Sequence, residues 1–392
     1  MPNQQFTLKN ATVVTPDRVI EKGVVDVENG RIKQVREQFD STPEDRDALD
    51  LLGKYIFPGF IDLHVHGGGG GSFNSVEPID HEKARSYHLQ HGTTSMLTTT
   101  STTEFVFLEK VLASLAVSAK APSKGSRVLG IHTEGPFISP KRNGAHHIPL
   151  ILEGSTELMD RLIFASNNSV SMVTVAPEIK GGLELIRHLI SKNIVASLGH
   201  SEATFEEATK GIELGATSTT HTFNAMSPLH HREPGMVGAV LDAEEIFCEA
   251  ILDGIHIHPV AFRVLLARKG IDRVNLVTDS TSYAGEGDGK YARPDGRFLI
   301  KDGGRIVIEG SDTLAGSSLN MNLALKNCLK FSGIELHDLS KLASLNAAII
   351  IGLDGDLGSI ENGKIADLVV LDANFDTQAV MMEGVWARND LS

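Results

Sequence analysis

The chain has 392 residues, of which 41% are hydrophobic and 22% charged, and its formal net charge is −14. This length suits one large domain plus a small one, and the negative charge argues against nonspecific nucleic-acid binding. No apolar run approaches the ~20 residues of a membrane span, and Cys248 and Cys328 lie in apolar segments. Residues 1–5 have no basic region followed by an apolar core, so no secretory signal is expected. We therefore expect a cytoplasmic protein without disulfides, whose partners are neither nucleic acids nor membranes.

Both ends of the chain predict β-strands. Near the N-terminus the strand patterns cover residues 6–8, 11–14, 23–27 and 31–35, and the polar residues 37–50 predict a loop. Near the C-terminus they cover residues 366–371, 377–381 and 384–387. We expect the two ends, residues 1–56 and 358–392, to form one small β domain of the sandwich type.

The middle of the chain, residues 57–357, alternates strand and helix patterns. Eight strands are predicted, over residues 56–66, 93–100, 127–134, 170–176, 194–200, 217–222, 246–253 and 274–279. Helical patterns lie between most of them, including residues 82–91, 104–119, 202–214 and 260–269, and two more helices follow over 318–331 and 339–351. Such alternation predicts an α/β fold, a (β/α)8 TIM barrel, and residues 283–309 predict a β-hairpin insertion.

Metal-binding residue types gather where these strands end. His64 and His66 lie two apart in the first strand, so their side chains point the same way. The other strands end in or near Glu134, His200, His221, His256 and Asp279. Functional groups of a TIM barrel lie at this end of the strands, and imidazole with carboxylate suits zinc, or else iron, manganese or cobalt. The sequence therefore predicts a divalent metal site.

In these residues and the motifs around them, the sequence resembles the amidohydrolase superfamily and, within it, the N-acetylglucosamine-6-phosphate deacetylases. The similarity spans nearly the whole chain in order. Its motifs are Pro58-Gly59-Phe60-Ile61-Asp62, His132-Thr133-Glu134-Gly135-Pro136-Phe137, Ser197-Leu198-Gly199-His200-Ser201, His221-Thr222-Phe223-Asn224-Ala225-Met226, Arg232-Glu233-Pro234-Gly235, Asp253-Gly254-Ile255-His256, Thr278-Asp279 and Leu314-Ala315-Gly316-Ser317.

The resemblance implies hydrolysis of the N-acetyl group of a phosphorylated amino sugar. It implies that Glu134, His200 and His221 hold the main metal. His64 and His66 are retained here, so a second ion bridged by Glu134 is expected, giving one or two ions per subunit. A metal lowers the pKa of bound water towards 7, and Asp279 would take the water's proton and return it to the leaving amine.

The resemblance also implies substrate contacts. His146 would polarise the acetyl carbonyl. Arg232 and His256, with Asn224 and Ala225, would bind the phosphate, and the arginine of relatives is described as reaching across from a neighbouring subunit. A homodimer is therefore expected. The backbone of Leu314, Ala315 and Gly316 would approach the sugar, because a glycine lets the chain come close.

Three alternatives stay open at this stage. The galactosamine epimer of the substrate differs at a single hydroxyl, and its contacts are not evident in the sequence. A dihydroorotase or an aminoacylase would usually carry a carboxylated lysine at the end of strand four, where this chain has Ala176-Pro177-Glu178. A non-catalytic sugar-phosphate sensor would be expected to lose the shuttle carboxylate, and Asp279 is present.

Overall fold

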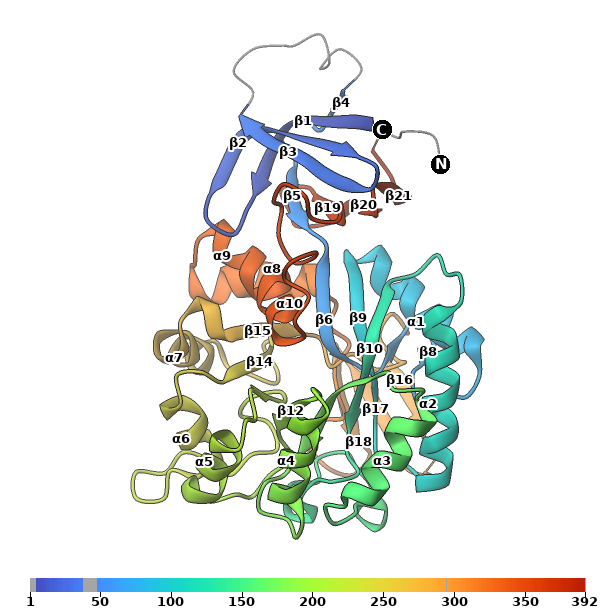
Figure 1. Cartoon of the computed structure of the whole chain (residues 1–392), viewed down its shortest axis with the longest axis vertical. Coiled ribbons are helices and arrows are strands. Elements are labelled where there is room, and N and C mark those ends of the chain that lie inside the picture. Colours follow the sequence, from blue (N-terminus) through green and yellow to red (C-terminus); the bar gives the residue numbers. More distant parts are fainter. Residues whose placement is uncertain (1–4, 38–47, 294, 392) are drawn as a thin grey trace.

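The computed structural model describes residues 5–37, 48–293 and 295–391. They form a parallel eight-stranded sheet, a second eight-stranded sheet built from both chain ends, and two smaller sheets. The terminal sheet lies at one end of the long axis and the barrel at the other (Figure 1). The prediction of a TIM barrel with a β unit from both chain ends is confirmed.

The barrel strands pair with their neighbours in chain order. They are β6 (Phe60–Val65), β9 (Thr93–Thr100), β10 (Arg127–Glu134), β11 (Val170–Val175), β12 (Val195–Leu198), β13 (Ser218–Thr219), β14 (Phe247–Ile251) and β15 (Val274–Val277). Every residue of β6, β9, β14 and β15 is buried, as expected for a parallel sheet with both faces covered.

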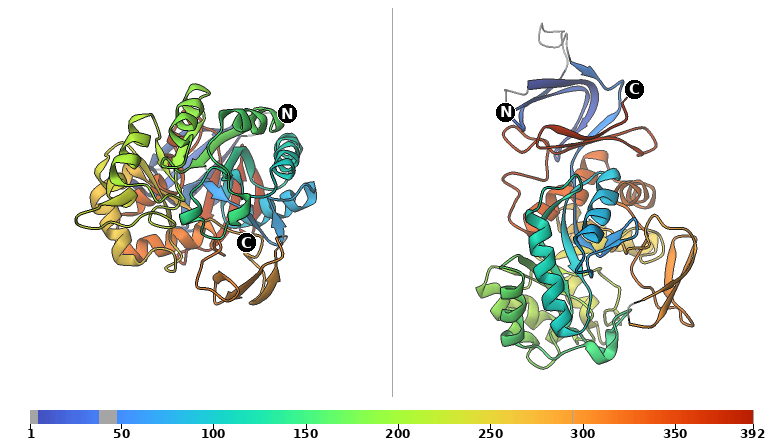
Figure 2. Two further views of the ribbon diagram at one scale, coloured as in Figure 1. Left: turned by 90° about the horizontal axis from the view of Figure 1, so that it is seen from below. Right: turned by 90° about the vertical axis from the view of Figure 1, so that its right-hand side faces the viewer.

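Helices surround the barrel (Figure 2). They are α1 (Pro78–Gln90), α2 (Phe105–Lys120), α3 (Thr156–Ala165), α4 (Gly182–Ser191), α5 (Phe205–Glu213), α6 (Gly235–Asp242), α7 (Pro259–Lys269) and α8 (Met321–Ser332). The helix predicted over residues 339–351 is interrupted: α9 (Leu336–Ser340) leads through a π-helical turn (Lys341–Leu345) into α10 (Asn346–Ile350).

The barrel closes between its first and last strands. Asp279 donates its backbone N–H to the carbonyl of His64 at 2.8 Å, and His66 donates to the carbonyl of Ser280 at 2.8 Å. Asp279 thus becomes a main-chain neighbour of His64 and His66, which lie far from it in the sequence.

The predicted first strand is in fact two strands. β5 (Tyr55–Pro58) pairs with β1 and β19 of the terminal sheet, whereas β6 pairs with β9 of the barrel. The break comes at Gly59, where a Cβ would lie 2.2 Å from the hydroxyl of Thr94. The chain therefore crosses from one sheet to the other where only glycine fits. The domain boundaries at residues 56 and 357 stay predictions.

The terminal sheet joins the two ends of the chain. It contains β1 (Gln5–Val14), β2 (Val19–Glu28), β3 (Arg31–Glu37), β4 (Leu49–Asp50), β5, β19 (Leu368–Leu371), β20 (Thr377–Met382) and β21 (Val385–Asn389). Figure 2 shows β1–β3 arched over the C-terminal strands, and a separate apolar core that includes Leu8, Val25 and Met381 lies within this unit. Of the predicted loop, residues 38–47 lie outside the described part of the chain.

The insertion after the last barrel strand has three strands where two were predicted. β16 (Gly289–Ala292) pairs with β17 (Phe298–Asp302), which pairs with β18 (Arg305–Ile308). Small β7 (Gly67–Gly68) and β8 (Gly71–Ser72) form the remaining sheet, within the glycine run. The insertion packs through Leu299 and Ile306 against Ala315.

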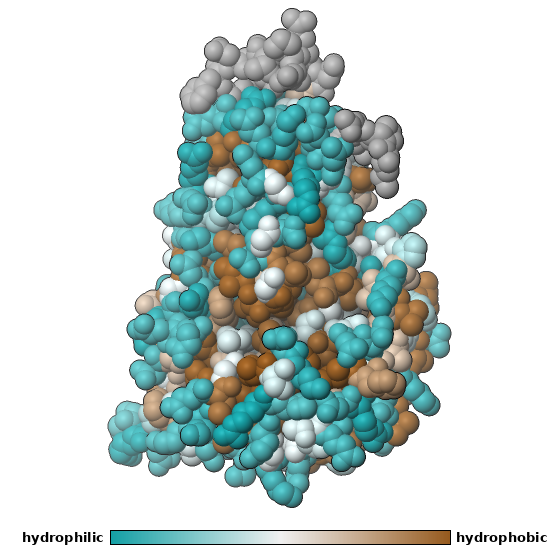
Figure 3. All heavy atoms as spheres, in the orientation of Figure 1, coloured by the Kyte–Doolittle hydropathy of each residue, from teal (hydrophilic) through white to brown (hydrophobic). Residues whose placement is uncertain are grey.

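The face drawn in Figure 3 is largely polar over the terminal sheet and the lower end of the barrel, and apolar residues gather between them at mid-height. Among the described residues, none of the helices combines the length and apolar character that a membrane span demands.

Candidate metal centre and active site

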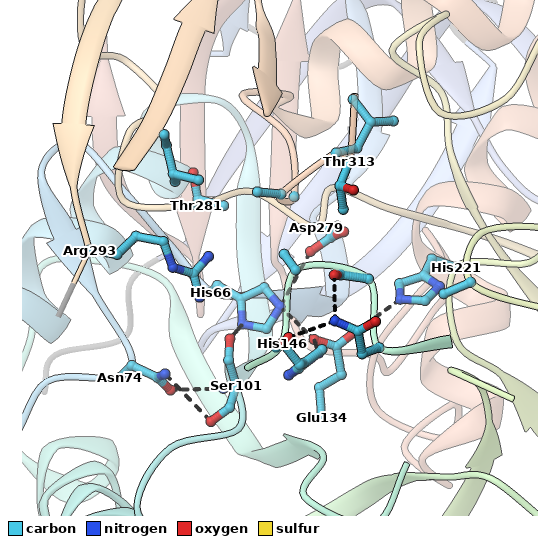
Figure 4. A pocket seen from close by; sticks show the side chains of 18 of the residues that line it. His66, Asn74, Ser101, Glu134, His146, His221, Asp279, Thr281, Arg293 and Thr313 are labelled. Atoms are coloured by element: carbon cyan, nitrogen blue, oxygen red, sulfur yellow. Dashed lines mark hydrogen bonds and ion pairs between the residues drawn. The ribbon is translucent and has the colours of Figure 1, made fainter. Parts of the chain in front are cut away.

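A cavity of about 820 Å³ opens at the carboxyl ends of the barrel strands. Figure 4 shows side chains of His66, His146, His221 and Asp279 gathered around Glu134 within it. The predicted site residues on its lining are His66, Glu134, His146, His200, His221, Asn224, Ala225, His256, Asp279, Leu314, Ala315 and Gly316. His64 lies directly beside this lining.

Glu134, at the end of β10, is the centre of the cluster. Its Oε1 lies 2.9 Å from Nε2 of His221 and 3.1 Å from Nε2 of His200. The two imidazole nitrogens are 3.0 Å apart. Candidate ligand atoms of these three residues lie within 4.8 Å of one another, which is the spacing of groups that share a cation.

The histidine pair of β6 faces the same carboxylate from the other side. Nε2 of His66 lies 3.2 Å from Glu134 Oε2 and 3.3 Å from Asp279 Oδ1. Nε2 of His64 lies 3.2 Å from that of His66, so the two side chains point the same way, as the alternation of strand residues predicts. His64, His66 and Asp279 form a second candidate cation group.

Hydrogen bonds on the far side of the rings fix which nitrogen is free to bind. Nδ1 of His200 faces the carbonyl of Arg142 at 2.8 Å, and Nδ1 of His66 faces that of Thr99 at 3.1 Å. A carbonyl only accepts, so each Nδ1 carries the proton and each Nε2 presents its lone pair to the cluster. This is the arrangement of metal-binding imidazoles, so the residues fit a divalent cation.

The electrostatics of the cluster point the same way. Burial raises the pKa of Asp279, but His64 and His66 more than offset this and bring it to about 2. Burial lowers the pKa of His64, yet Glu134, Asp279 and Glu249 raise it to about 10. Buried carboxylates at this density require positive charge among them, supplied either by protons on the imidazoles or by divalent cations.

His146 is a neutral donor beside Glu134. Burial lowers its pKa to about 4. Its Nδ1 accepts a hydrogen bond from the backbone N–H of Thr102 at 3.2 Å, so the ring proton is on Nε2, 3.1 Å from Glu134 Oε2. The neighbouring His147 is only partly buried and does not line the cavity.

The predicted phosphate contacts lie partly in the cavity. Asn224, Ala225 and His256 line it, and Asp253 holds the ring of His256 through a 2.6 Å contact between Oδ2 and Nδ1. Arg232 does not line it. The Arg232 side chain is exposed and contacts His231 Nε2 at 2.7 Å.

The segment Leu314-Ala315-Gly316 lines the cavity as predicted, but Gly316 has a further role. It has a φ of 61°, and a Cβ there would lie 2.8 Å from the carbonyl oxygen of Asp279. Glycine is therefore required so that the segment can pack against Asp279.

The structure adds residues that the motifs did not reveal. Asn74, Ser101 and Arg293 also line the cavity, and Glu249 contacts His64 from inside the barrel. The signal for Glu249 was available: it is a lone charged residue within an apolar strand. Glu178, which follows β11, accepts hydrogen bonds from Ser201 Oγ and the backbone N–H of Glu202.

Comparison with known proteins places this site in a family. The sequence pattern of the amidohydrolase family matches residues 55–387, most of the chain. The chain belongs to the amidohydrolase family. The resemblance found in the motifs is confirmed, and this amidohydrolase has a barrel with candidate metal-binding residues at the ends of its strands.

Relatives of this amidohydrolase carry two related names. An N-acetylglucosamine-6-phosphate deacetylase of Bacillus subtilis (strain 168) is 33% identical over 97% of this chain and 96% of its own length. An N-acetylgalactosamine-6-phosphate deacetylase of Escherichia coli O157:H7 is 36% identical over 87% of this chain and 88% of its own. A solved N-acetyl-D-glucosamine-6-phosphate deacetylase mutant from Mycobacterium smegmatis, in complex with N-acetyl-D-glucosamine-6-phosphate, superposes with a TM-score of 0.92, 31% identity, and coverage of 98% of this chain and 100% of that one.

Proposed function

We propose that this chain hydrolyses the N-acetyl group of N-acetyl-D-glucosamine 6-phosphate to D-glucosamine 6-phosphate and acetate, in amino sugar catabolism or recycling. The observation that carries the proposal is the buried Glu134, surrounded by imidazole nitrogens and faced by Asp279 in a sugar-sized cavity. Relatives above 30% identity whose names state this activity support the same substrate.

The proposed cofactor is a divalent metal, with zinc as the first choice. Glu134, His200 and His221 would hold one ion, and His64 and His66 would hold a second one shared with Glu134. The bound metal would supply a water activated at neutral pH and polarise the acetyl carbonyl. Iron, manganese and cobalt accept the same nitrogen and oxygen donors, so affinity alone does not select among them.

Asp279 is the proposed catalytic residue. Positive charge beside Asp279, from protonated imidazoles or from bound cations, keeps the pKa of its carboxyl below the usual range, so the group is ionised and can accept a proton from the attacking water. The same group then donates that proton to the departing nitrogen as the C–N bond breaks. The water oxygen ends in the acetate, and the proton that Asp279 took from the water ends on the amine of the sugar.

His146 and the distal residues would position the substrate. The Nε2–H of His146 points towards Glu134 and suits a hydrogen bond to the acetyl oxygen. His256, Asn224 and Ala225 would meet the phosphate, with Arg232 reaching over from the second subunit of a homodimer. The exposed place of Arg232, outside the cavity of its own chain, supports a role in the partner's site.

The galactosamine epimer is the second candidate substrate, because the Escherichia coli relative named for it is 36% identical. Release of free amine from both acetylated 6-phosphates, measured side by side, decides between the epimers. The expected result is a higher kcat/KM on the glucosamine derivative and a much lower one on unphosphorylated N-acetylglucosamine. Turnover of the galactosamine derivative alone would replace the proposed substrate, and turnover of neither would refute the proposal.

A further inference from the structure

Glu249 is a wholly buried carboxylate that the proposed reaction does not use. It lies in the middle of β14, where the other residues are Phe247, Cys248, Ala250 and Ile251. Its side chain is 0% exposed, and a buried ionised carboxylate is strongly disfavoured unless its neighbours compensate for the charge. The identity of those neighbours therefore indicates what the residue does.

One oxygen of Glu249 contacts two of the proposed metal ligands. Oε2 lies 3.0 Å from Nδ1 of His64 and accepts the backbone N–H of His221 at 2.9 Å. His64 donates from Nδ1, so its Nε2 presents a lone pair to His66 and Glu134. A single carboxylate oxygen thus fixes a side chain from β6 and the main chain that follows β13.

Among the described residues, His64 is the only side chain that forms a hydrogen bond with the carboxylate of Glu249. The nearby His132 has both ring nitrogens engaged, with Leu63 O at 3.1 Å and Thr174 Oγ1 at 2.8 Å. Oε1 of Glu249 has no hydrogen-bond partner among the described residues. The negative charge is therefore directed at the imidazole of His64.

The two histidines of the pair differ in this respect. Nδ1 of His66 faces the neutral carbonyl of Thr99, whereas Nδ1 of His64 faces an anion. A carboxylate behind an imidazole fixes the ring and makes its other nitrogen a stronger metal ligand. The side chain of His64 is also more deeply buried than that of His66. A cation bound there is farther from water, so a nearby negative charge matters more for its stability.

We propose that Glu249 is a positioning residue whose negative charge enables the His64–His66 pair to bind a second divalent cation. The ion at Glu134, His200 and His221 does not require that charge, because Glu249 meets this group only through a backbone N–H. This inference rests on the proposed metal centre and concerns its second ion alone.

Glu249→Gln tests it, because an amide oxygen can accept both hydrogen bonds without the charge. Glu178→Gln is the matched control: Glu178 also accepts two hydrogen bonds, from Ser201 Oγ and the Glu202 N–H, both at 2.7 Å. Each stripped protein is titrated with Co²⁺. Ions per subunit are counted by elemental analysis, the visible absorption of bound Co²⁺ is followed, and circular dichroism checks the fold.

Wild type and Glu178→Gln should bind two ions per subunit. Glu249→Gln should bind the first ion normally and the second about 10- to 100-fold more weakly. Glu249→Asp, which keeps the charge, should bind the second ion more tightly than Glu249→Gln. Unchanged second-ion affinity in Glu249→Gln, or a single ion in wild type, would overturn the inference.

If Glu249→Gln does not fold, Glu249→Asp decides through its own comparison with wild type, because its side chain is one methylene shorter and holds the retained charge farther from His64. A weaker second ion beside a normal first ion supports the role, and an unchanged second ion contradicts it. Amine release by wild-type protein holding one ion is measured separately. That measurement tests the proposed function, whereas the ion counts test the role of Glu249, so either can fail without the other.

Discussion

Asp279 is held in place by the backbone around it. It has a φ of 48°, a left-handed conformation that costs free energy for a residue with a Cβ. Its N–H donates to His64 O at 2.8 Å, and Ser317 donates its N–H to the carbonyl of Asp279 at 2.7 Å. His200 and His221 also have positive φ values, 46° and 32°. The ends of the barrel strands thus carry strain where the site needs side chains aimed inward.

Asp279→Asn should abolish most turnover without removing the metal held by Glu134. An amide cannot accept and return the proton, so kcat should fall by about 10²- to 10⁴-fold, the usual contribution of acid–base catalysis. Steady-state kinetics and elemental analysis on the same preparation check this. Normal turnover in the variant would contradict the shuttle role.

His146→Asn should lower kcat by about 10²- to 10³-fold, the usual loss when a donor to a developing oxyanion is removed. The matched control is His147→Asn, since that neighbour does not line the cavity. Equal losses in the two variants would show that the loop, and not the His146 donor, is what matters.

The sequence predicted the identity of most candidate site residues but not how they are supported. Motif spacing marks His200 and His221, yet their positive φ values depend on how each strand enters its loop. Because ligand residues were taken to end their strands, the predicted strands are too long: residues 217–222 contain only the two-residue β13. Glu249 belongs to no motif, so its contact with His64 became evident only when β14 was placed beside β13.

Among the helices, α5 has an N-terminal capping signal that explains where it begins. Thr204 accepts the N–H of Glu207 at 3.2 Å, and Glu207 accepts the N–H of Thr204 at 2.9 Å, which is a complete capping box. The helix was predicted from residue 202, but this pair sets its first residue at Phe205. It follows directly after the loop that carries His200.

Thr204→Ala should lower the free energy of unfolding by about 1 kcal/mol, because one N-terminal N–H loses its partner. Glu206→Ala is the control in the same turn, outside the capping box, and should cost less. Urea unfolding followed by circular dichroism measures both, and an equal loss in the two variants would argue against the cap.

Periodicity predicted most helices and strands because burial dictates it. The three-stranded insertion shows the limit: in β16, Gly289, Lys290 and Ala292 are exposed and only Tyr291 is partly buried. A strand whose side chains do not alternate between core and solvent leaves no pattern, so its pairing with β17 emerges only from the fold.

At the scale of the whole molecule, the strand that carries Glu134 is tied to the terminal sheet at its other end. Arg127, the first residue of β10, forms ion pairs with Asp367 at 2.6 Å and with Glu383 at 2.9 Å. The joining of both chain ends in one sheet was predictable from their strand patterns. The packing of that sheet against the barrel was not, because it depends on pairs such as these.

The proposed dimer makes a prediction that mixing can test. Arg232→Ala should raise KM for the phosphorylated sugar by roughly 10- to 100-fold, the usual effect of losing a charged hydrogen bond. A mixed dimer of Arg232→Ala with Asp279→Asn should regain one working site, because each subunit supplies what the other lacks. The two variants are co-expressed with different tags and purified through both.

The mixed dimer should therefore show about half the wild-type rate at low substrate, and each variant alone should show little. Activity of the mixture no higher than the sum of the separate variants would place Arg232 in its own subunit's site or outside any site. Light scattering on wild-type protein checks the subunit number.

We propose that the residues around Glu134 hold the metal on which deacetylation by this chain depends. The most direct measurement is acetate release from N-acetylglucosamine 6-phosphate by chelator-stripped protein, titrated with Zn²⁺ while bound ions are counted. Stripped protein should have negligible activity, and activity should rise in step with the first ion bound per subunit. Full activity in stripped protein whose metal content is shown to be negligible would contradict it.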